Sequence, residues 1–234
     1  MTKTKFCISI LTCIVFLSSC KTLQISDLRP LNPSNPKLPM LVPKIDVQTL
    51  QNSYSSGSSI STGFGSAVPV GTIAIGTFAS SSISFPDKRQ QDIVTLFERD
   101  VADNICSGKE SKGSVELKIT FSHTKEGGWG YLVPAIFTAG IAWAFGMPMN
   151  TVTQELELQV EIKNSANVSV GKYTASAKAK TNVAAYSGYK KGDAPYIVQA
   201  SVGRKANIDA YNEAMKIIKS QIQTDYTRLI QELK

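Results

Sequence analysis

The stretch TVTQELELQVEIK, residues 151–163, alternates apolar and polar side chains more cleanly than any other part of the chain. Successive side chains of a β-strand point to opposite faces, so this alternation predicts a strand with one buried face and one wet face. The side chains predicted to point inward are Val152, Leu156, Leu158, Val160 and Ile162. Those predicted to point outward are Glu155, Glu157, Gln159 and Glu161.

Similar patterns predict neighbouring strands on either side of this one. Residues 114–122 alternate with Val115, Leu117, Ile119 and Phe121 on the inward face. After a turn at 164–167, residues 168–180 pair back, with Val168 and Val170 inward and then Tyr173, Ala175, Ala177 and Ala179. This change of parity predicts a β-bulge at Gly171. Residues 40–50 predict a further strand. Pro43 cannot donate to a ladder, so it either places this strand at a sheet edge or delays its start.

Two segments show helical spacing. Pro86 and Asp87 suit the first turn of a helix that ends near Ile105. A longer helix is predicted over about 204–233. The apolar stripe of the first is Ile93, Leu96, Phe97, Val101 and Ile105; that of the second is Ala206, Ala210, Ala214, Ile217, Ile218, Ile222, Leu229, Ile230 and Leu233. The expected fold is α+β: a two-layer sandwich with a mostly antiparallel sheet of about four strands, two helices and an apolar insert between two strands.

The predicted insert, residues 127–150, reads GGWGYLVPAIFTAGIAWAFGMPMN and contains no charge. Its prolines and glycines argue against one straight helix, and it joins two strands expected to pair antiparallel. One interpretation is an interfacial or re-entrant hairpin that touches the membrane, and the other is a cover on the core or on a partner. The candidate contact residues are Trp129, Tyr131, Phe137, Ile141, Trp143 and Phe145.

The N-terminus, MTKTKFCISILTCIVFLSSC, has a short basic region, then an apolar run from Phe6 to Leu17 of the length found in secretory signals. The run ends in Leu17-Ser18-Ser19-Cys20, which resembles the lipobox of bacterial lipoproteins. The resemblance implies removal of residues 1–19 and a lipid on the Cys20 thiol. Lysine rather than aspartate at position 21 implies, by the same resemblance, the outer membrane. The alternative is an ordinary signal peptide or an uncleaved anchor.

Residues 20–39 have a proline at every third position from Pro30 to Pro39, the repeat of a polyproline II helix. We expect a proline-rich tether that reaches up to about 60 Å from the lipid; the alternative is a ligand for an aromatic groove on a partner. Residues 40–234 then form one domain, in which residues 51–84 are an uncharged loop rich in serine and glycine. No phosphate-binding loop is predicted there, because no Gly-Lys-Ser/Thr follows the glycines.

Few side chains suit catalysis. Cys106 is the one cysteine left beyond position 20, and His123 is the one histidine of the chain. Because Cys106 would then be the only thiol left, we expect no internal disulfide. Opposite ends of a strand separate Cys106 from His123, so we also expect no thiol dyad. The glutamates of 155–161 are interpreted as a solvated strand face. We therefore predict no enzyme, no catalytic residue, no metal site and no cofactor.

The basic residues are more informative. Without Lys3 and Lys5 the chain keeps 23 Lys and Arg against 18 Asp and Glu. Lysines are interleaved with tyrosines over 172–196, and in an exported protein their expected partner is an anionic headgroup or polymer rather than nucleic acid. The candidates are Lys178, Lys180, Lys190 and Lys191. The alternative is that lysines protect an edge strand from pairing.

The order of elements is similar to that of the small α/β domains of Gram-negative envelope lipoproteins, such as transporter-accessory and lipopolysaccharide-assembly lipoproteins. The predicted function is a lipid-anchored outer-membrane lipoprotein that binds or scaffolds unidentified envelope proteins without catalysis. Its domain then lies in the periplasm or at the cell surface, and membrane lipid contacts it through Cys20 and through residues 129–149. Two alternatives are a cell-wall or envelope hydrolase and a surface-exposed adhesion or substrate-binding module.

Overall fold

The computed structural model describes residues 28, 30–31, 33–55, 72–74, 87–127, 148–184 and 198–233. The predicted signal peptide, Cys20, most of the serine- and glycine-rich loop and the insert from 128 to 147 lie outside these residues. So does the segment 185–197.

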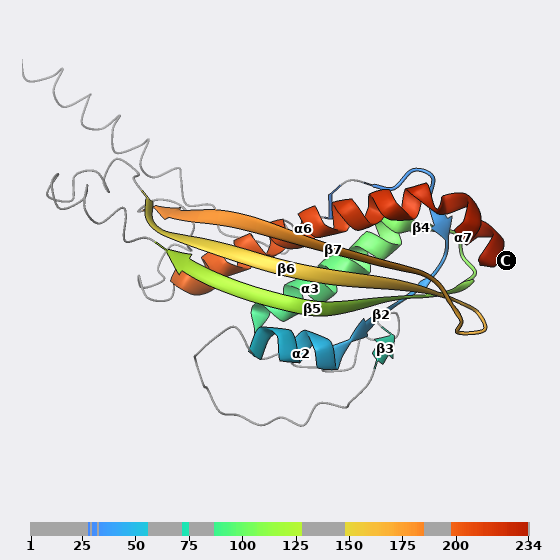
Figure 1. Cartoon of the computed structure of the whole chain (residues 1–234), viewed down its shortest axis with the longest axis horizontal. Helices are drawn as coiled ribbons and strands as arrows, with labels where there is room; N and C mark the ends of the chain where they lie inside the picture. Colours follow the sequence, from blue (N-terminus) through green and yellow to red (C-terminus); the bar gives the residue numbers. More distant parts are fainter. Residues whose placement is uncertain are drawn as a thin grey trace, which may run out of the picture.

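A five-stranded sheet in the order β3-β2-β5-β6-β7 forms one layer of the fold (Figure 1). Three long strands, β5 (Gly113–Gly127), β6 (Pro148–Asn164) and β7 (Ser169–Ala184), form an antiparallel meander. The short β2 (Val42–Asp46) runs parallel to β5 and antiparallel to β3 (Thr72–Ala74). The mostly antiparallel sheet is confirmed, and β3 adds a strand inside the predicted loop.

Helices cover one face of this sheet. Helix α3 (Lys88–Arg99) continues as a π-helix, η3 (Asp100–Ile105), and α6 (Val198–Thr224) runs along β6 and β7 before the short α7 (Tyr226–Glu232). The Asp87 side chain accepts a hydrogen bond from the backbone N–H of Arg89 and caps α3. The α+β class is confirmed, with an apolar core between the sheet and these helices. Among the described residues, no helix is long and apolar enough to cross a membrane.

The strand predicted over residues 40–50 is wrong in its second half, and β2 is no edge strand, because it pairs with β3 on one side and β5 on the other. The chain leaves β2 at Asp46 and enters helix α2, Val47–Ser55. Asp46 Oδ1 accepts hydrogen bonds from the backbone N–H groups of Gln48 and Thr49, both at 3.1 Å, which is the contact that starts a helix. An aspartate cap therefore outweighs the strand-like alternation of the preceding residues.

The prediction for β6 is confirmed, because its five inward residues are no more than 1% exposed. In β5 the pattern fails at Phe121. Ile119 pairs with Leu158 but Phe121 pairs with Glu157, so the extra residue Thr120 forms a bulge. Phe121 therefore points outward and is 47% exposed.

The predicted bulge of β7 is confirmed. Ile162 pairs with Gly171 and Lys163 with Ser169, which leaves Val170 as the extra residue. Val168 was predicted to point inward, but it lies before this irregularity in the turn and is 58% exposed.

Helix α6 begins earlier than predicted, and the chain breaks at Asp225 before α7. The apolar stripe is buried apart from Ile217, which is 42% exposed, and Ile230, which is partly buried.

The described part of the predicted tether lies against the domain. Residues Leu38–Pro39 form β1, which pairs in parallel with β4, Cys106–Ser107. Leu28 and Leu38 are 3% and 1% exposed and belong to the hydrophobic core. The described residues of this segment, from Leu28 on, are therefore part of the folded body, which differs from the free rod expected from its prolines.

Candidate functional site

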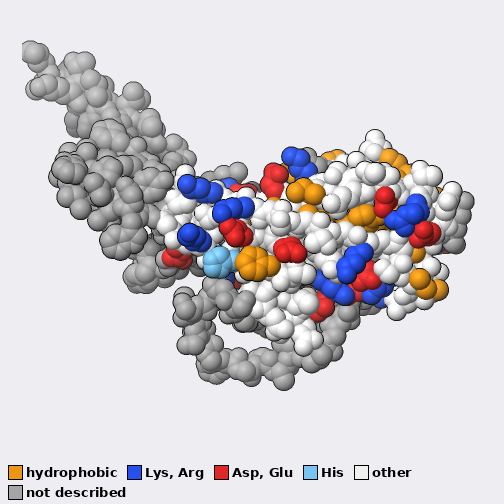
Figure 2. All heavy atoms as spheres, in the orientation of Figure 1, with side chains coloured by type: hydrophobic (Ala, Val, Ile, Leu, Met, Phe, Trp, Pro, Cys, Tyr) orange, Lys and Arg blue, Asp and Glu red, His pale blue; other side chains and the backbone are white. Residues whose placement is uncertain are grey.

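The face of β5, β6 and β7 opposite the helices carries alternating cationic and anionic side chains (Figure 2). We call it the outer sheet face. Its members follow from the strand register and are Glu116, Lys118, Phe121, His123, Lys125, Thr153, Glu155, Glu157, Gln159, Glu161, Lys163, Lys172, Thr174, Ser176, Lys178 and Lys180. The face divides into two halves with different charge.

The half near the β6–β7 turn holds a compact ion-pair cluster. Lys163 Nζ lies 2.7 Å from Glu116 Oε2, and Lys118 Nζ lies 3.3 Å from Glu116 Oε1. Both lysines also lie 3.7 Å from Glu161. The Glu116 side chain is only 4% exposed, and its burial acts to raise its pKa. The hydrogen bonds and charges of Lys163 and Lys118 outweigh burial and lower that pKa below its usual value.

The other half has more cations than carboxylates. Cross-strand register brings His123, Glu155 and Lys178 into one row and Lys125, Thr153 and Lys180 into the next. Lys178 Nζ donates to Glu155 Oε1 at 2.5 Å, and this hydrogen bond with the lysine charge lowers the Glu155 pKa. Three lysines thus stand beside one carboxylate on this half, which we call the basic half.

An aromatic pair borders the basic half. The rings of Phe121 and His123 lie 6.2 Å apart between centroids, at an interplanar angle of 30°. The bulge at Thr120 puts Phe121 on this face, which is why strand alternation alone did not find it.

Strand register also says which end of the sheet the basic half occupies. Gly127 pairs with Thr151, and Pro148 pairs with Ala184. The chain therefore leaves β5 and enters β6 at one end of the sheet, and it leaves β7 at the same end. The rows of Lys125 and Lys178 lie next to this end, so the predicted insert is attached beside the basic half.

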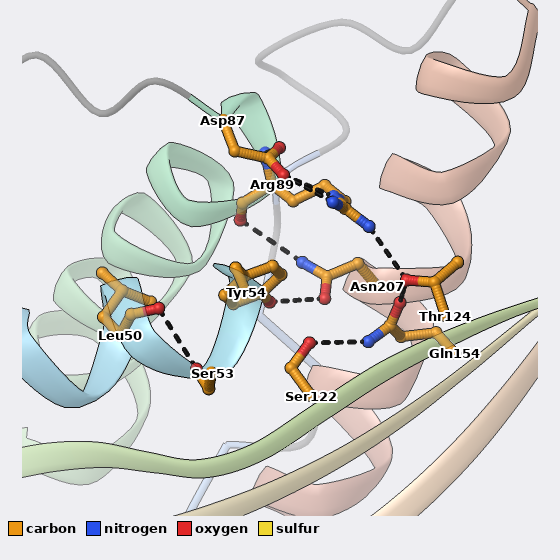
Figure 3. A network of polar contacts seen from close by, with 9 residues as sticks. All are labelled: Leu50, Ser53, Tyr54, Asp87, Arg89, Ser122, Thr124, Gln154 and Asn207. Carbon is orange, nitrogen blue, oxygen red and sulfur yellow. Dashed lines mark hydrogen bonds and ion pairs between the residues drawn. The ribbon is translucent and has the colours of Figure 1, made fainter. Parts of the chain in front are cut away.

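Behind the basic half, on the helix side of the sheet, polar side chains replace the apolar core (Figure 3). Arg89 Nη1 donates to Thr124 Oγ1 at 2.9 Å, and Thr124 Oγ1 donates to Gln154 Oε1 at 2.6 Å. Gln154 is fully buried, and its Nε2 donates to Ser122 Oγ at 2.9 Å. This series of hydrogen bonds joins the start of α3 to β5 and β6.

The same cluster reaches helices α2 and α6. Tyr54 Oη donates to Asn207 Oδ1 at 2.6 Å, and Asn207 Nδ2 donates to the carbonyl oxygen of Arg89 at 3.3 Å. The Arg89 guanidinium lies 5.4 Å from the centroid of the Tyr54 ring and also pairs with Asp87. Burial raises the pKa of Tyr54 well above its usual value. This cluster fixes the end of the domain that bears the insert, and the donors and acceptors named here are used within it.

Some of the site residues predicted from the sequence lie in the described part of the structure, and others do not. Lys178 and Lys180 lie on the outer sheet face as expected for outward positions of β7. Trp129, Tyr131, Phe137, Ile141, Trp143, Phe145, Lys190, Lys191 and Cys20 lie outside the described residues. Lys118, Lys125 and Lys163 also belong to this surface, and they were not predicted because only the strand register brings them together.

Cys106 and His123 are not brought together. Cys106 is 1% exposed in the core, and burial raises the pKa of its thiol to about 12. His123 is exposed on the outer sheet face and lies within β5, which continues to Gly127, rather than at a strand end. Among the described residues, no three His, Cys, Asp or Glu side chains are grouped so as to hold a metal ion.

Comparison with known proteins identifies no family: no family model and no curated protein matches the chain. Among solved structures, the chain is similar to one described as "a putative lipoprotein from Caulobacter crescentus CB15", at 13% identity. The match covers 58% of this chain and 76% of that one, with a TM-score of 0.30. A likeness at this level transfers neither fold nor function.

Proposed function

We propose that this protein is a lipid-anchored lipoprotein of the bacterial cell envelope, held in the outer membrane through Cys20, with a binding or scaffolding role and no catalysis. The proposal rests on the order of basic region, apolar run and Leu17-Ser18-Ser19-Cys20 at the N-terminus. Several acyl chains hold a protein stably at a membrane, whereas one holds it only marginally. The domain then contributes surface rather than chemistry.

The structural observation that best supports this function is the position of the basic half. Both ends of the apolar insert are attached next to Lys125, Lys178 and Lys180, and so is the start of the segment with Lys190 and Lys191. Lysines beside tryptophan and tyrosine are typical of surfaces that meet anionic headgroups. We infer that this end of the domain contacts the membrane, through charge on the sheet and apolar side chains of the insert.

The insert returns to the end of the sheet from which it leaves, since β5 and β6 pair antiparallel on both sides of it. Both ends of a segment attached in this way lie on the same side of the membrane, so it is not a single transmembrane span. It therefore acts as a second contact beside the lipid, through Trp129, Tyr131, Phe137, Ile141, Trp143 and Phe145.

The anchor is tested by labelling growing cells with radioactive palmitate. Label is expected on the wild-type chain and none on Cys20→Ala. Equal incorporation into both chains contradicts the anchor.

The surface is tested by flotation of the Cys20→Ala chain with anionic vesicles, where acylation cannot hold the protein. Replacing Lys125, Lys178 and Lys180 together by Gln is expected to weaken binding at least several-fold, since each lysine near such a surface contributes about 1 kcal/mol. The matched control replaces Lys109, Lys112 and Lys216, exposed lysines away from the outer sheet face and from the end that bears the insert, by Gln. The double variant Trp143→Asp/Phe137→Asp tests the insert. Equal binding by the lysine variant, its control and the aspartate variant contradicts a membrane role for this end.

A further inference from the structure

The segment between the predicted lipid site and the first long strand is tied to the helix layer at several points. We call the described part of residues 28–39 the strap. Arg99 Nη1 donates to the carbonyl oxygen of Leu28 at 2.7 Å, and Lys219 Nζ donates to that of Leu31 at 2.5 Å. Gln223 Nε2 donates to the carbonyl oxygen of Asn35 at 3.2 Å. Side chains of α3 and α6 thus bind the backbone of a segment more than 70 residues away in sequence.

The strap also contributes to the core and to the backbone hydrogen bonds. Its Ser34 N–H donates to the carbonyl oxygen of Asn104 at 3.0 Å, and Lys37 Nζ donates to that of Asp103 at 2.6 Å. Leu28 and Leu38, at its two ends, are almost fully buried, while Leu31 between them is 54% exposed. A segment with buried leucines at both ends and polar contacts between them is fixed along its whole length rather than hinged at one point.

This attachment changes the length of chain available as a spacer. An undocked segment from Cys20 to Pro39 reaches about 60 Å in a polyproline II conformation. With the strap bound, only the eight steps from Cys20 to Leu28 remain, and they span at most about 28 Å when fully extended. The place where the strap begins, beside Arg99, then lies within that distance of the lipid.

We propose that the strap is a fixed mount: it holds the domain against the membrane leaflet that carries its own lipid, so the anionic surface met by the basic half is that leaflet. This rests on the proposed lipid anchor at Cys20. Because the anchor keeps the basic half close to the headgroups, the effective concentration of headgroups at this surface is high even if it binds them weakly. The contact therefore needs little intrinsic affinity.

Cleavage by trypsin tests whether the strap is bound to the domain, and this test does not depend on the lipid. Lys37 is the one cleavable site for trypsin from residue 28 to residue 39, because Arg29 precedes a proline. In the full native chain, cleavage after Lys37 is expected to be at least tenfold slower than in the urea-unfolded chain. Leu28→Asp is expected to speed it, and Leu31→Asp, an exposed leucine of the same strap, is the matched control. Arg99→Gln, which removes only side-chain contacts, gives an intermediate rate should Leu28→Asp fail to fold. Native cleavage as fast as that of the unfolded chain overturns the mount.

The distance between the domain and the membrane is measured by fluorescence energy transfer, with the lipidated protein reconstituted into phosphatidylcholine and phosphatidylglycerol vesicles. The dye is placed at Lys216→Cys, an exposed position one helical turn before Lys219, and the acceptor is on the lipid. High transfer is expected for the wild-type strap and for Leu31→Asp, and clearly lower transfer for Leu28→Asp. Equally low transfer in all three overturns the proposal.

Failure of the lipid anchor has its own signature. If the full chain and Cys20→Ala float equally poorly with vesicles, the anchor and the membrane height fail together. Slow cleavage after Lys37 then still reports a bound strap, which separates the two failures.

Discussion

Lys219 Nζ lies 2.9 Å from Asp100 Oδ1, and the two side chains are 5% and 0% exposed. Asn104 Nδ2 donates to the same oxygen at 2.7 Å, while Lys219 also donates to the carbonyl oxygen of Leu31. One buried ion pair therefore joins α6, η3 and the strap. Burial raises the pKa of Asp100 and outweighs the opposing effect of Lys219, so this carboxylate is costly to ionise.

The first prediction concerns the loss of one partner of this pair. Lys219→Met leaves Asp100 buried without its cation, and the free energy of unfolding is expected to fall by about 3–5 kcal/mol. The double variant Lys219→Met/Asp100→Leu removes both charges and is expected to regain more than half of that loss. Urea unfolding of the wild type, Lys219→Met and the double variant measures this. A double variant no more stable than Lys219→Met contradicts the assignment of the cost to an uncompensated charge.

The second prediction concerns pH and the ion-pair cluster of the outer sheet face. The folded pKa of Glu116 is lower than its unfolded value of 4.5, so the stability it contributes is present above that value and is lost as pH falls through the folded pKa. The free energy of unfolding is therefore expected to decline below about pH 5. Glu116→Gln reduces this decline and costs about 1.5–3 kcal/mol at pH 7, the usual range for hydrogen bonds to charged groups.

Glu157→Gln is the matched control, because Glu157 lies on the same face and outside the ion-pair cluster. It is expected to change stability by less than about 0.5 kcal/mol. An equal effect of the two substitutions on the pH dependence contradicts the role given to Glu116.

Strand alternation and helical spacing predicted the parts of the fold in which burial decides residue type. The inward face of β6, the apolar side of α3 and the bulge near Gly171 follow from such patterns, because each element buries one face against one core. Phe121 was misplaced because the bulge at Thr120 is set by pairing with β6, and nothing within residues 114–122 marks it.

The candidate surface and the strap were less predictable for a related reason. The rows Lys125–Thr153–Lys180 and His123–Glu155–Lys178 exist only once the register is known. The strap is held by Lys219, 188 residues from Leu31, so its prolines alone predicted a free spacer. The helix over residues 47–55 was not predicted either, because a single cap at Asp46 decides between strand and helix.

The third prediction concerns the thiol of Cys106. Because the thiol is buried and its pKa is about 12, it is almost never a thiolate at neutral pH. In the native lipidated chain, a maleimide or an aromatic disulfide reagent at pH 8 is expected to leave Cys106 unmodified, and in guanidinium to modify it fully. Peptide mass spectrometry measures the fraction. Ser107→Cys, its exposed neighbour, is the positive control and reacts without denaturant. Fast native modification of Cys106 reopens a nucleophilic role for it.

The fourth prediction concerns the two ends of β5. A Cβ atom at Gly113 lies 2.0 Å from the carbonyl oxygen of Lys163 and 3.0 Å from the Cα atom of Asn164, both backbone atoms of β6. A Cβ at Gly127, by contrast, meets no atom of the described residues within 4 Å. Gly113→Ala forces the start of β5 away from β6, next to the residue whose Nζ pairs with Glu116.

Gly113→Ala is therefore expected to lower the free energy of unfolding by about 2–3 kcal/mol or more, as overpacking against backbone does, and Gly127→Ala to change it by less than about 0.5 kcal/mol. Because the displacement also moves Lys163, the losses from Gly113→Ala and Glu116→Gln are expected to be less than additive in a double-mutant cycle. Urea denaturation at pH 7 measures the wild type and the four variants. Equal stability of the two alanine variants means that β5 and β6 do not approach at Gly113 as described, and strict additivity with Glu116→Gln means that the Lys163 ion pair survives the displacement.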